Sequence, residues 1–283
     1  MNKVEEKAVE IKKLKIIANE LRKDSLRMIT LANSGHPGGS LSIAEIITCL
    51  YFHEMNFNKD LLKSKERDRL VLSKGHCAPI QYAALAKLGI IPKEELDYLR
   101  KIDHMLQGHP DRNKTAGIEV NTGSLGQGFS QAVGIALAGK IDKLNYRTFV
   151  ILGDGEIQEG QIWEAAMAAS HFKLNNLIAF VDHNRLQIDG CVKDIMNVEP
   201  IEDKFKSFGW NVYKINGHNV EQILDTLEFT KNASRPTMIL LETIKSKGVS
   251  FMENSCDWHG KALNKEMLEK ALKEIDIIIK EIG

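Results

Sequence analysis

The stretch from Arg147 to Gly190 constrains the fold most, because two short apolar runs flank a segment with helical periodicity. Residues 147–152 and 177–181 are rich in β-branched, aromatic and aliphatic side chains, which is typical of buried strands. Between them, residues 158–172 carry apolar side chains at the spacing of one helix face. Strand, helix and strand in this length predict a βαβ unit with parallel strands and a right-handed crossover.

Polar residues follow both predicted strands. The first strand ends at Gly153-Asp154-Gly155, and Asn184 comes directly after the second. If the strands are neighbours, these residues meet at the carboxyl edge of the sheet, where open α/β sheets bind ligands. A carboxylate and an amide oxygen suit Mg²⁺, with phosphate oxygens and water completing its shell, and the glycines allow a diphosphate to come close. The alternative is an ordinary Gly-Asp-Gly turn.

The rest of the chain continues the alternation of strands and helices. We expect one helix to be capped by Ser42, with Glu45 completing a capping box. Further strands are predicted at 69–72, 210–215 and 236–243, and further helices at 4–31, 79–88, 92–102, 129–144, 201–208, 220–232 and 264–279. This order predicts an α/β fold, a doubly wound parallel sheet with helices on both faces. Without an internal repeat or a linker, we expect a single domain over residues 1–283.

Composition excludes several classes of protein. Lys plus Arg and Asp plus Glu both total 38, so there is no basic surplus of the kind that a general nucleic-acid binder shows. No apolar run approaches 18 residues and residues 1–15 lack a hydrophobic core, so neither a membrane span nor a secretory signal is expected. The four cysteines are far apart, which favours reduced thiols in a cytoplasmic protein.

Four of the nine histidines, His36, His76, His109 and His259, lie in glycine-containing loops after predicted helices or strands. A single loop histidine is usually a solvated surface residue, but four in such positions suggest a shared site. Histidine titrates near neutrality and can exchange protons with alcohols and carbonyls. Zinc ligation is the other functional interpretation, and the wide separation of these residues without paired spacing argues against it.

Three polar residues of the central stretch have a plausible purely structural interpretation. Glu159 starts the predicted helix, where a carboxylate suits the helix dipole without any further role. Asp182 and His183 precede Asn184, and we interpret both as polar strand-end residues rather than catalytic groups.

Seven segments in a fixed order resemble the amino-terminal, diphosphate-binding half of transketolases. They are SGHPGGSLS, LSKGHCAP, GHP, TGSLGQGFS, GDGEIQEGQIWEA, DHNRLQIDG and WHG, within residues 26–263. GDG with a distant asparagine is shared by thiamine diphosphate enzymes in general, whereas the ordered histidine loops are specific to the transketolase group. One departure is Ser124, which stands where full-length transketolases usually have proline.

The resemblance implies a role for each matching residue. The Mg²⁺ ligands would be the side chains of Asp154 and Asn184 and the backbone carbonyl of Leu186. The catalytic candidates are His36, His109 and His259, which would face the donor sugar, and Glu159, which would link paired active sites at a dimer interface. Contacts to thiamine diphosphate are implied for His76, Gly123, Leu125, Gly153, Asp154, Gly155, Glu156, Asn184 and His259.

A full-length transketolase continues beyond the point that matches Gly283, with a pyrimidine-binding domain and a further carboxyl-terminal domain. The resemblance therefore implies the N-terminal subunit of a split transketolase, which acts only in an α2β2 assembly with a C-terminal partner subunit. It would bind thiamine diphosphate and Mg²⁺ and transfer a two-carbon ketol unit from a ketose phosphate to an aldose phosphate, as in the pentose phosphate pathway. We expect an exposed apolar patch around Leu125 on the side facing the partner.

Three alternatives stay open on the sequence. The α subunit of a 2-oxo-acid dehydrogenase decarboxylase also has GDG and a separate β chain, although the histidine loops weigh against it. A fragment of a deoxyxylulose-phosphate synthase is disfavoured for the same reason. The third alternative is a non-catalytic subunit that binds the cofactor without turnover.

Overall fold

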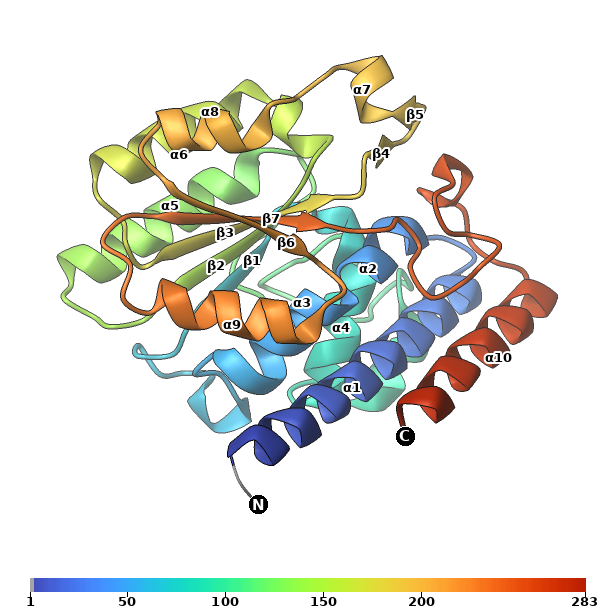
Figure 1. Cartoon of the computed structure of the whole chain (residues 1–283). Coiled ribbons are helices and arrows are strands. Elements are labelled where there is room, and N and C mark those ends of the chain that lie inside the picture. The colour runs from blue at the N-terminus through green and yellow to red at the C-terminus, as the bar shows by residue number, and fades with distance from the viewer. Residues whose placement is uncertain (1–2) are drawn as a thin grey trace.

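The structure is a computed structural model that describes residues 3–283. Its centre is a five-stranded sheet in the order β1-β2-β3-β7-β6, in which all neighbouring strands are parallel (Figure 1). The strands are β1 (Arg69–Leu72), β2 (Thr148–Gly153), β3 (Leu177–His183), β6 (Asn211–Asn216) and β7 (Thr237–Glu242). A separate antiparallel hairpin pairs β4 (Leu186–Gln187) with β5 (Gly190–Cys191).

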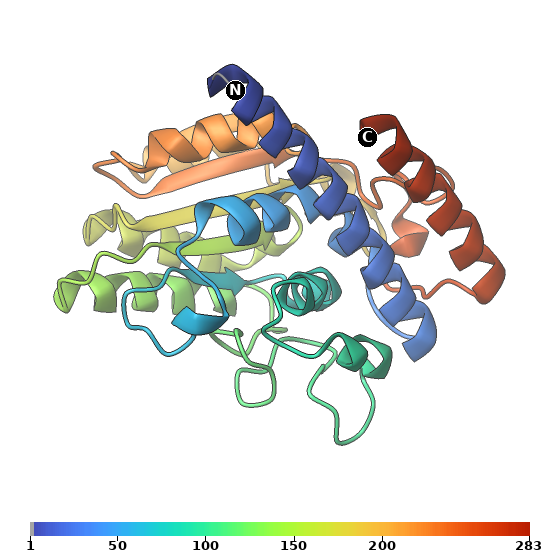
Figure 2. The same cartoon turned by 90° about the horizontal axis from the view of Figure 1, so that it is seen from below.

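Helices occupy both faces of this sheet. The α-helices of the described residues are α1 (Lys3–Ala32), α2 (Pro37–Ser42), α3 (Ala44–Cys49), α4 (Ala78–Lys87), α5 (Gln127–Ile141), α6 (Gly160–His171), α7 (Val192–Ile195), α8 (Ile201–Ser207), α9 (Val220–Thr230) and α10 (Lys265–Ile282). Helices α5, α6 and α8 cover one face, and α3, α4 and α9 lie on the other, crossed by the long α1 (Figures 1 and 2). The prediction of a doubly wound parallel sheet is confirmed.

The alternation of side chains along the central strands explains the two cores. In β2, Phe149 and Ile151 join the apolar cluster on the α1 side, whereas Val150 and Leu152 join the cluster under α5 and α6. Successive side chains of a strand point to opposite faces, so a strand covered on both sides must be apolar throughout. This is why residues 147–152 appear in the sequence as a continuous apolar run rather than an alternating one.

The carboxyl-terminal helix α10 packs along α1, and Figure 1 shows both ends of the chain on the same side of the molecule. A third apolar cluster contains Leu26 of α1, Trp258, and Ala271 and Ile275 of α10. This cluster holds the segment 245–260 against the ends of α1 and α2, and it thereby positions His259. None of the helices in residues 3–283 is long and apolar enough to cross a lipid bilayer.

Two local predictions are wrong. Ser42 does not cap a helix: it is the last residue of α2, and its hydroxyl lies 2.6 Å from the Asp182 carboxylate and 2.9 Å from the Gly39 carbonyl. Glu45 completes no capping box either, because it forms a buried ion pair with Arg22. Residues 92–102 form only a 3₁₀ helix, Lys93–Tyr98, in which Leu96 is the one buried residue. Too little apolar surface is available there to hold a longer helix.

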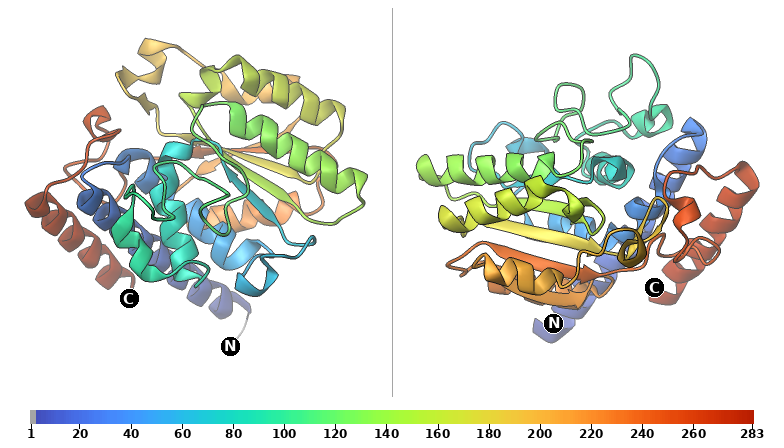
Figure 3. Two further views of the ribbon diagram at one scale, coloured as in Figure 1. Left: turned by 180° about the vertical axis from the view of Figure 1, so that it is seen from behind. Right: turned by 90° about the horizontal axis from the view of Figure 1, so that it is seen from above.

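The segment between α4 and α5 runs mostly as loops, drawn in teal and green in Figure 3. It includes His109 and the glycines that precede α5. Because all five strands of the sheet are parallel, their carboxyl ends lie at one edge, and the loops that follow β1, β2, β3 and β7 begin there. The predicted site residues are concentrated in these loops.

Candidate active site

The structure brings every predicted site residue to the wall of one cavity at the carboxyl edge of the sheet. This cavity measures about 310 Å³. Its walls include His36, His76, His109, Gly123, Leu125, Gly153, Asp154, Gly155, Glu156, Glu159, Asn184, Leu186 and His259. A larger groove of about 570 Å³ lies at the ends of β6 and β7. There the charged side chains of Arg185, Lys214 and Glu242 pair with one another, so we assign the site to the smaller cavity.

Asp154 and Asn184 follow neighbouring strands, because β2 pairs with β3 in parallel register. The Asp154 carboxylate accepts hydrogen bonds from the backbone N–H groups of Gly155, at 2.8 Å, and Arg185. The Asn184 amide oxygen accepts from the backbone N–H of Leu186 at 3.1 Å. Both side chains are buried, and both keep oxygen lone pairs available to a cation.

The Asp154 carboxylate lacks a close positive partner. Burial, together with the neighbouring charge of Asp182, raises its pKa to about 6. Within residues 3–283 no cationic side chain forms an ion pair with it, and its partners are backbone N–H groups. A buried carboxylate without a countercharge is costly unless a cation binds there. This observation fits a divalent ion held by Asp154 and Asn184.

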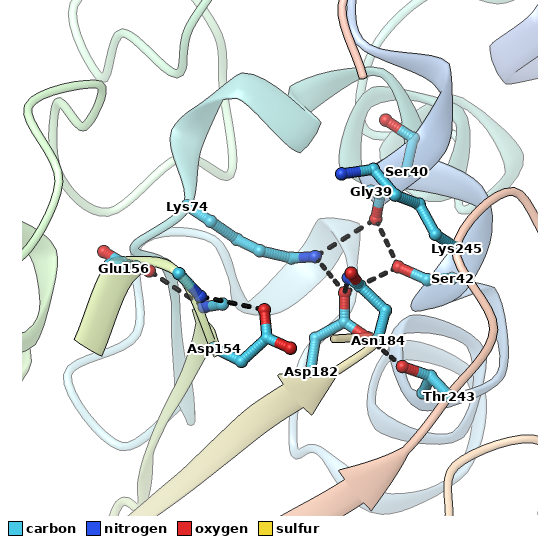
Figure 4. A network of polar contacts seen from close by, with 12 residues as sticks. Gly39, Ser40, Ser42, Lys74, Asp154, Glu156, Asp182, Asn184, Thr243 and Lys245 are labelled. Atoms are coloured by element: carbon cyan, nitrogen blue, oxygen red, sulfur yellow. Dashed lines mark hydrogen bonds and ion pairs between the residues drawn. The ribbon is translucent and has the colours of Figure 1, made fainter. Parts of the chain in front are cut away.

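Asp182 has the opposite environment and lies in the polar network shown in Figure 4. Its carboxylate accepts from the Lys74 amine at 2.5 Å, from the Ser42 hydroxyl at 2.6 Å, and from the Asn184 amide at 2.8 Å. Thr243 donates a further bond. Although burial raises the pKa of Asp182, the Lys74 charge and these bonds hold it below its ordinary value. Asp182 is thus a structural residue that orients Asn184.

Glu156 also serves the scaffold. One of its oxygens accepts from the Ser73 hydroxyl and from the backbone N–H of Gly126 at 3.0 Å. The other accepts from the backbone N–H of Gly153 at 3.0 Å. With its carboxylate occupied by three donors, Glu156 ties the ends of β1 and β2 to the start of α5. Glu156 shapes the cavity, and most of its oxygen lone pairs already accept hydrogen bonds from the protein.

The four loop histidines converge, although they come from widely separated segments. The ring centroid of His36 lies 5.1 Å from that of His76, 6.2 Å from that of His109 and 5.5 Å from that of His259. The rings of His76 and His259 are 5.2 Å apart. The buried Nδ1 atom of His36 has no hydrogen-bond partner in the described residues, as expected for a group that faces a ligand.

Burial keeps these histidines neutral at physiological pH. It lowers the pKa of His36 to about 4, with further contributions from Arg100, His109 and Lys245. Burial and the charge of Lys245 lower the pKa of His259 to about 3. The pKa values of His76 and His109 are lowered mainly by burial as well. Neutral imidazoles can accept a proton from a substrate hydroxyl and return it.

Two buried lysines complete the site, and the sequence analysis missed both. Lys74 reaches Asp182, and the amine of Lys245 donates to the Leu186 carbonyl at 2.9 Å and lies 3.1 Å from Nδ1 of His259. Burial and the charge of Lys74 lower the pKa of Lys245. The sequence does contain a signal that could have identified both lysines as site residues, because each follows a predicted strand within three residues.

The apolar patch expected around Leu125 is not present as predicted. Leu125 lines the cavity but is only half-exposed, because the loop that carries it packs beside Glu159. The exposed apolar side chains near the cavity are instead Ile188, at 66% exposure, Ile195 at 45% and Met196 at 61%, on and beside the β4-β5 hairpin. Glu159 itself is exposed at the start of α6.

A metal site built from protein ligands alone finds no support in residues 3–283. No group of three or more His, Cys, Asp or Glu side chains is arranged there to hold an ion. The histidine cluster therefore gives no sign of a zinc site. The pair Asp154 and Asn184 can hold a metal only if other oxygens, such as those of a diphosphate, complete its shell.

A parallel sheet with aspartate and asparagine at the ends of adjacent strands, beneath glycine loops and a histidine-lined cavity, defines a class of diphosphate-cofactor-binding α/β domains. Residues 13–277 match the family model described as "Transketolase, thiamine diphosphate binding domain". The chain therefore belongs to the transketolase family.

Two curated relatives match the chain over nearly their whole length. The "6-deoxy-6-sulfo-D-fructose transketolase subunit SqwG" of Clostridium sp. (strain MSTE9) is 50% identical over 92% of this chain and 94% of its own length. One of the subunits of the "Apulose-4-phosphate transketolase" of Phocaeicola vulgatus is 40% identical over 97% of this chain and 98% of its own length. These matches confirm the predicted N-terminal transketolase subunit.

Solved structures of undivided transketolases have the same fold. The transketolase of Campylobacter jejuni superposes with a TM-score of 0.88 at 35% identity, over 93% of this chain and 42% of that one. The transketolase of Leishmania mexicana gives a TM-score of 0.86 at 28% identity, over 95% of this chain and 45% of that one. In these proteins the matching region is thus less than half of a longer chain.

Proposed function

We propose that this chain holds Mg²⁺ and thiamine diphosphate and, together with a C-terminal partner subunit, transfers a two-carbon ketol unit from a ketose phosphate to an aldose phosphate. The observation that carries the proposal is the uncompensated Asp154 carboxylate beside Asn184, in a cavity lined by four neutral histidines. The names of the two curated relatives, each of which denotes one subunit of a transketolase, support a two-chain enzyme.

The proposed cofactor contacts divide between the two ends of the cavity. Asp154, Asn184 and the Leu186 carbonyl are the proposed Mg²⁺ ligands. The diphosphate would lie against the backbone of Gly153 and Gly155. His76, His259 and the amine of Lys245 would be its side-chain contacts, and Gly123 and Leu125 would bind the aminopyrimidine. When bound, thiamine diphosphate supplies the carbon nucleophile and the electron sink that the reaction needs.

Proton transfer and sugar binding are the proposed tasks of the histidines. His36, His109 and His259 lie in one cluster and are neutral near pH 7, so each can accept a hydroxyl proton and return it. The free Nδ1 of His36 is available to a sugar hydroxyl.

We propose an α2β2 assembly, with two copies of this chain and two of the partner. The exposed apolar group of Ile188, Ile195 and Met196 borders the cofactor cavity, which favours it as the surface that the partner's pyrimidine-binding domain covers. Exposed Glu159 and the neighbouring helix α5 are the proposed contact between two copies of this chain.

We also propose that residues 1–283 form one domain and that the protein works in the cytoplasm. One continuous parallel sheet, with apolar clusters on both faces, supports the first point. The second is supported by the four cysteines, all of which are free thiols.

The test compares this chain alone with the same chain coexpressed with the product of a neighbouring reading frame that carries a pyrimidine-binding pattern. Ketol transfer is measured with Mg²⁺, thiamine diphosphate, a ketose phosphate and an aldose phosphate. We expect transfer from the complex and none from this chain alone, and a complex of the Asp154→Ala variant serves as the inactive control. Substantial transfer by the chain alone would refute the split-enzyme proposal, and decarboxylation of pyruvate without ketol transfer would favour the decarboxylase alternative.

A further inference from the structure

A polar network away from the cavity links helices α1 and α3 to the loop between β6 and α9. The Glu45 carboxylate accepts from the Arg22 guanidinium at 2.7 Å and lies 3.0 Å from Nδ1 of His218. No more than 12% of any of these three side chains is exposed. Although burial raises the pKa of Glu45, the Arg22 charge and the bond with His218 lower it to about 2, so this carboxylate is ionised.

The other ring nitrogen of His218 accepts a hydrogen bond from the segment that follows β7. The backbone N–H of Ile244 donates to Nε2 of His218 at 2.8 Å. An imidazole nitrogen that accepts a hydrogen bond carries no proton, so the proton of a neutral His218 lies on Nδ1 and is donated to Glu45. Glu45 therefore stabilises the tautomer of His218 that can hold Ile244.

Close packing brings His218 to this position. Gly217 precedes it, and the Gly217 N–H donates to the Glu242 carbonyl at 2.8 Å. A Cβ added to Gly217 would stand 2.5 Å from Cγ2 of Thr243, so only glycine lets the loop come this close to the end of β7. The contact between His218 and Ile244 is thus built into the backbone on both sides.

Ile244 directly precedes Lys245, whose buried side chain lines the cofactor cavity. The Lys245 amine lies 2.9 Å from the Leu186 carbonyl and 3.1 Å from Nδ1 of His259. Its stem passes Gly38, where an added Cβ would stand 2.9 Å from Cε of Lys245. Because this packing leaves the lysine little room to adjust, the position of its amine depends on how the backbone before it is held.

We propose that His218 is a positioning residue, which holds the Ile244 N–H and thereby sets the place of the Lys245 amine in the cavity. This inference rests on the proposed diphosphate site, in which that amine is a contact. His218 itself lines the groove at the ends of β6 and β7 and not the cavity, so it acts through the backbone. Charge-assisted hydrogen bonds to phosphate oxygens are short, so they require an accurately placed donor.

The alternative is that the network only stabilises the fold. Other bonds hold the chain around Lys245: the Ser246 N–H donates to the Gly38 carbonyl at 3.0 Å, and the Asn254 N–H donates to the Lys245 carbonyl at 3.1 Å. These two bonds act at and after Lys245, whereas the bond to His218 holds the residue directly before it. The two roles differ in what a change at His218 does to Lys245, and this difference can be measured.

Two substitutions separate the two hydrogen bonds of His218. Asparagine places an amide nitrogen where Nδ1 stands, so His218→Asn can still donate to Glu45 but cannot accept from Ile244. Glutamine places its amide oxygen near the position of Nε2, so His218→Gln can still accept from Ile244 but cannot donate to Glu45. The matched control is Thr226→Val, which removes a side-chain hydrogen bond to the Gln222 carbonyl within α9.

The decisive measurement is the affinity of the full chain for inorganic pyrophosphate in the presence of Mg²⁺, obtained by calorimetric titration. We expect Lys245→Met to weaken binding roughly 10- to 100-fold, as for the loss of a charge-assisted hydrogen bond, and His218→Asn to weaken it about fivefold or more. His218→Gln and Thr226→Val should stay within about twofold of the wild type, because both keep the bond to Ile244.

A double variant tests whether His218 acts through Lys245. His218→Asn combined with Lys245→Met should bind pyrophosphate as Lys245→Met alone does, because no amine is left to position. Additive losses in the double variant, equal weakening in the asparagine and glutamine variants, or wild-type affinity in His218→Asn would each overturn the proposal. Unchanged affinity in Lys245→Met would refute the diphosphate contact and, with it, this role of His218.

A second measurement decides the matter even if the wild type binds no pyrophosphate, which would refute the proposed cofactor site itself. The ring signals of His259, which lies 3.1 Å from the Lys245 amine, are followed by NMR in the chain without ligand. We expect His218→Asn to shift these signals in the same direction as Lys245→Met, and His218→Gln and Thr226→Val to leave them unchanged. Unshifted signals in His218→Asn, or equal shifts in the asparagine and glutamine variants, would contradict the positioning role.

Discussion

The amine of Lys74 lies 2.5 Å from the carboxylate of Asp182, and both side chains are fully buried. Lys74 follows β1 and Asp182 lies at the end of β3, so the ion pair passes over the end of the intervening strand β2. Asp154 follows β2 and therefore lies beside a pair whose charges already cancel. Although burial lowers the pKa of Lys74, the Asp182 charge raises it above its ordinary value, so this pair stays ionised. No ion pair in residues 3–283 supplies a positive charge to Asp154, which fits the proposed binding of a cation there.

Breaking this ion pair should destabilise the fold. We expect Lys74→Met to lower the free energy of unfolding by about 3–5 kcal/mol, because it leaves Asp182 buried without its cation. Urea denaturation measures the effect, and Lys63→Met, at an exposed position, is the control. A loss below about 1 kcal/mol would mean that Asp182 is stabilised mainly by its hydroxyl and amide donors.

Removing the Asp154 carboxylate should separate cofactor binding from folding. We expect Asp154→Ala to abolish Mg²⁺-dependent binding of thiamine diphosphate, since it deletes the only charged protein ligand of the proposed metal. Stability at neutral pH should not fall by more than about 1 kcal/mol, because the deleted charge has no ion-pair partner. Calorimetric titration in the two-subunit complex provides the affinity. Asp142→Ala, at an exposed position, is the control, and unchanged affinity in Asp154→Ala would show that the metal site is wrongly assigned.

The histidines should affect turnover more than stability. We expect His109→Ala and His259→Ala each to lower kcat of the complex by about 100-fold or more if they transfer protons. Thermal unfolding of the same variants should differ little from the wild type. His171→Ala is the control, because His171 is exposed at the end of α6, away from the cavity walls. Near-normal turnover in both variants would show that these histidines line the cavity but do not transfer protons.

Stability should depend on pH through the buried histidines. The pKa values of His36, about 4, and His259, about 3, lie below the ordinary value of 6.5. At these two positions the unfolded chain therefore binds more protons below pH 6.5, so their contribution to the free energy of unfolding falls as the pH drops from 6.5 towards 4. In His36→Asn the free energy of unfolding should change less steeply with pH, by an amount that corresponds to at most one bound proton. The exposed variant His171→Asn should match the wild type. Identical slopes for His36→Asn and the wild type, from urea unfolding at several pH values, would contradict a neutral buried His36.

Local patterns in the sequence predicted the elements that build the sheet. Residues 69–72 form β1 as expected, and the other four strands of the sheet differ from their predicted bounds by two residues or fewer at each end. Buried parallel strands are continuous apolar runs, so their positions depend on nearby residues alone. The sequence left the adjacency of β2 and β3 as a condition, and the structure meets it, so that Asp154 and Asn184 follow neighbouring strands.

The prediction of a capping box was wrong because longer-range contacts bind both of its residues, whereas residues 92–102 have too little apolar surface to hold a full helix. Ser42 and Glu45 have the right spacing, but Asp182 and Arg22, which are far away in the sequence, bind them instead. No local pattern shows such competition. The exposed apolar group around Ile188 was missed for a related reason, since exposure depends on which surfaces the folded chain leaves uncovered.

The sequence by itself determined the strands, the family and most of the residues that line the cavity, although not Lys74 and Lys245, because strand patterns and spaced motifs are properties of neighbouring residues. Only the tertiary structure decided how charge is distributed among the residues in and around the cavity. It paired Lys74 with Asp182, left Asp154 without an ion-pair partner, and buried His36 and His259 so that their pKa values fall. The physical reason is that the cost of a charge depends on its burial and on every neighbour within a few ångströms. Those neighbours come from segments that the sequence separates by tens of residues.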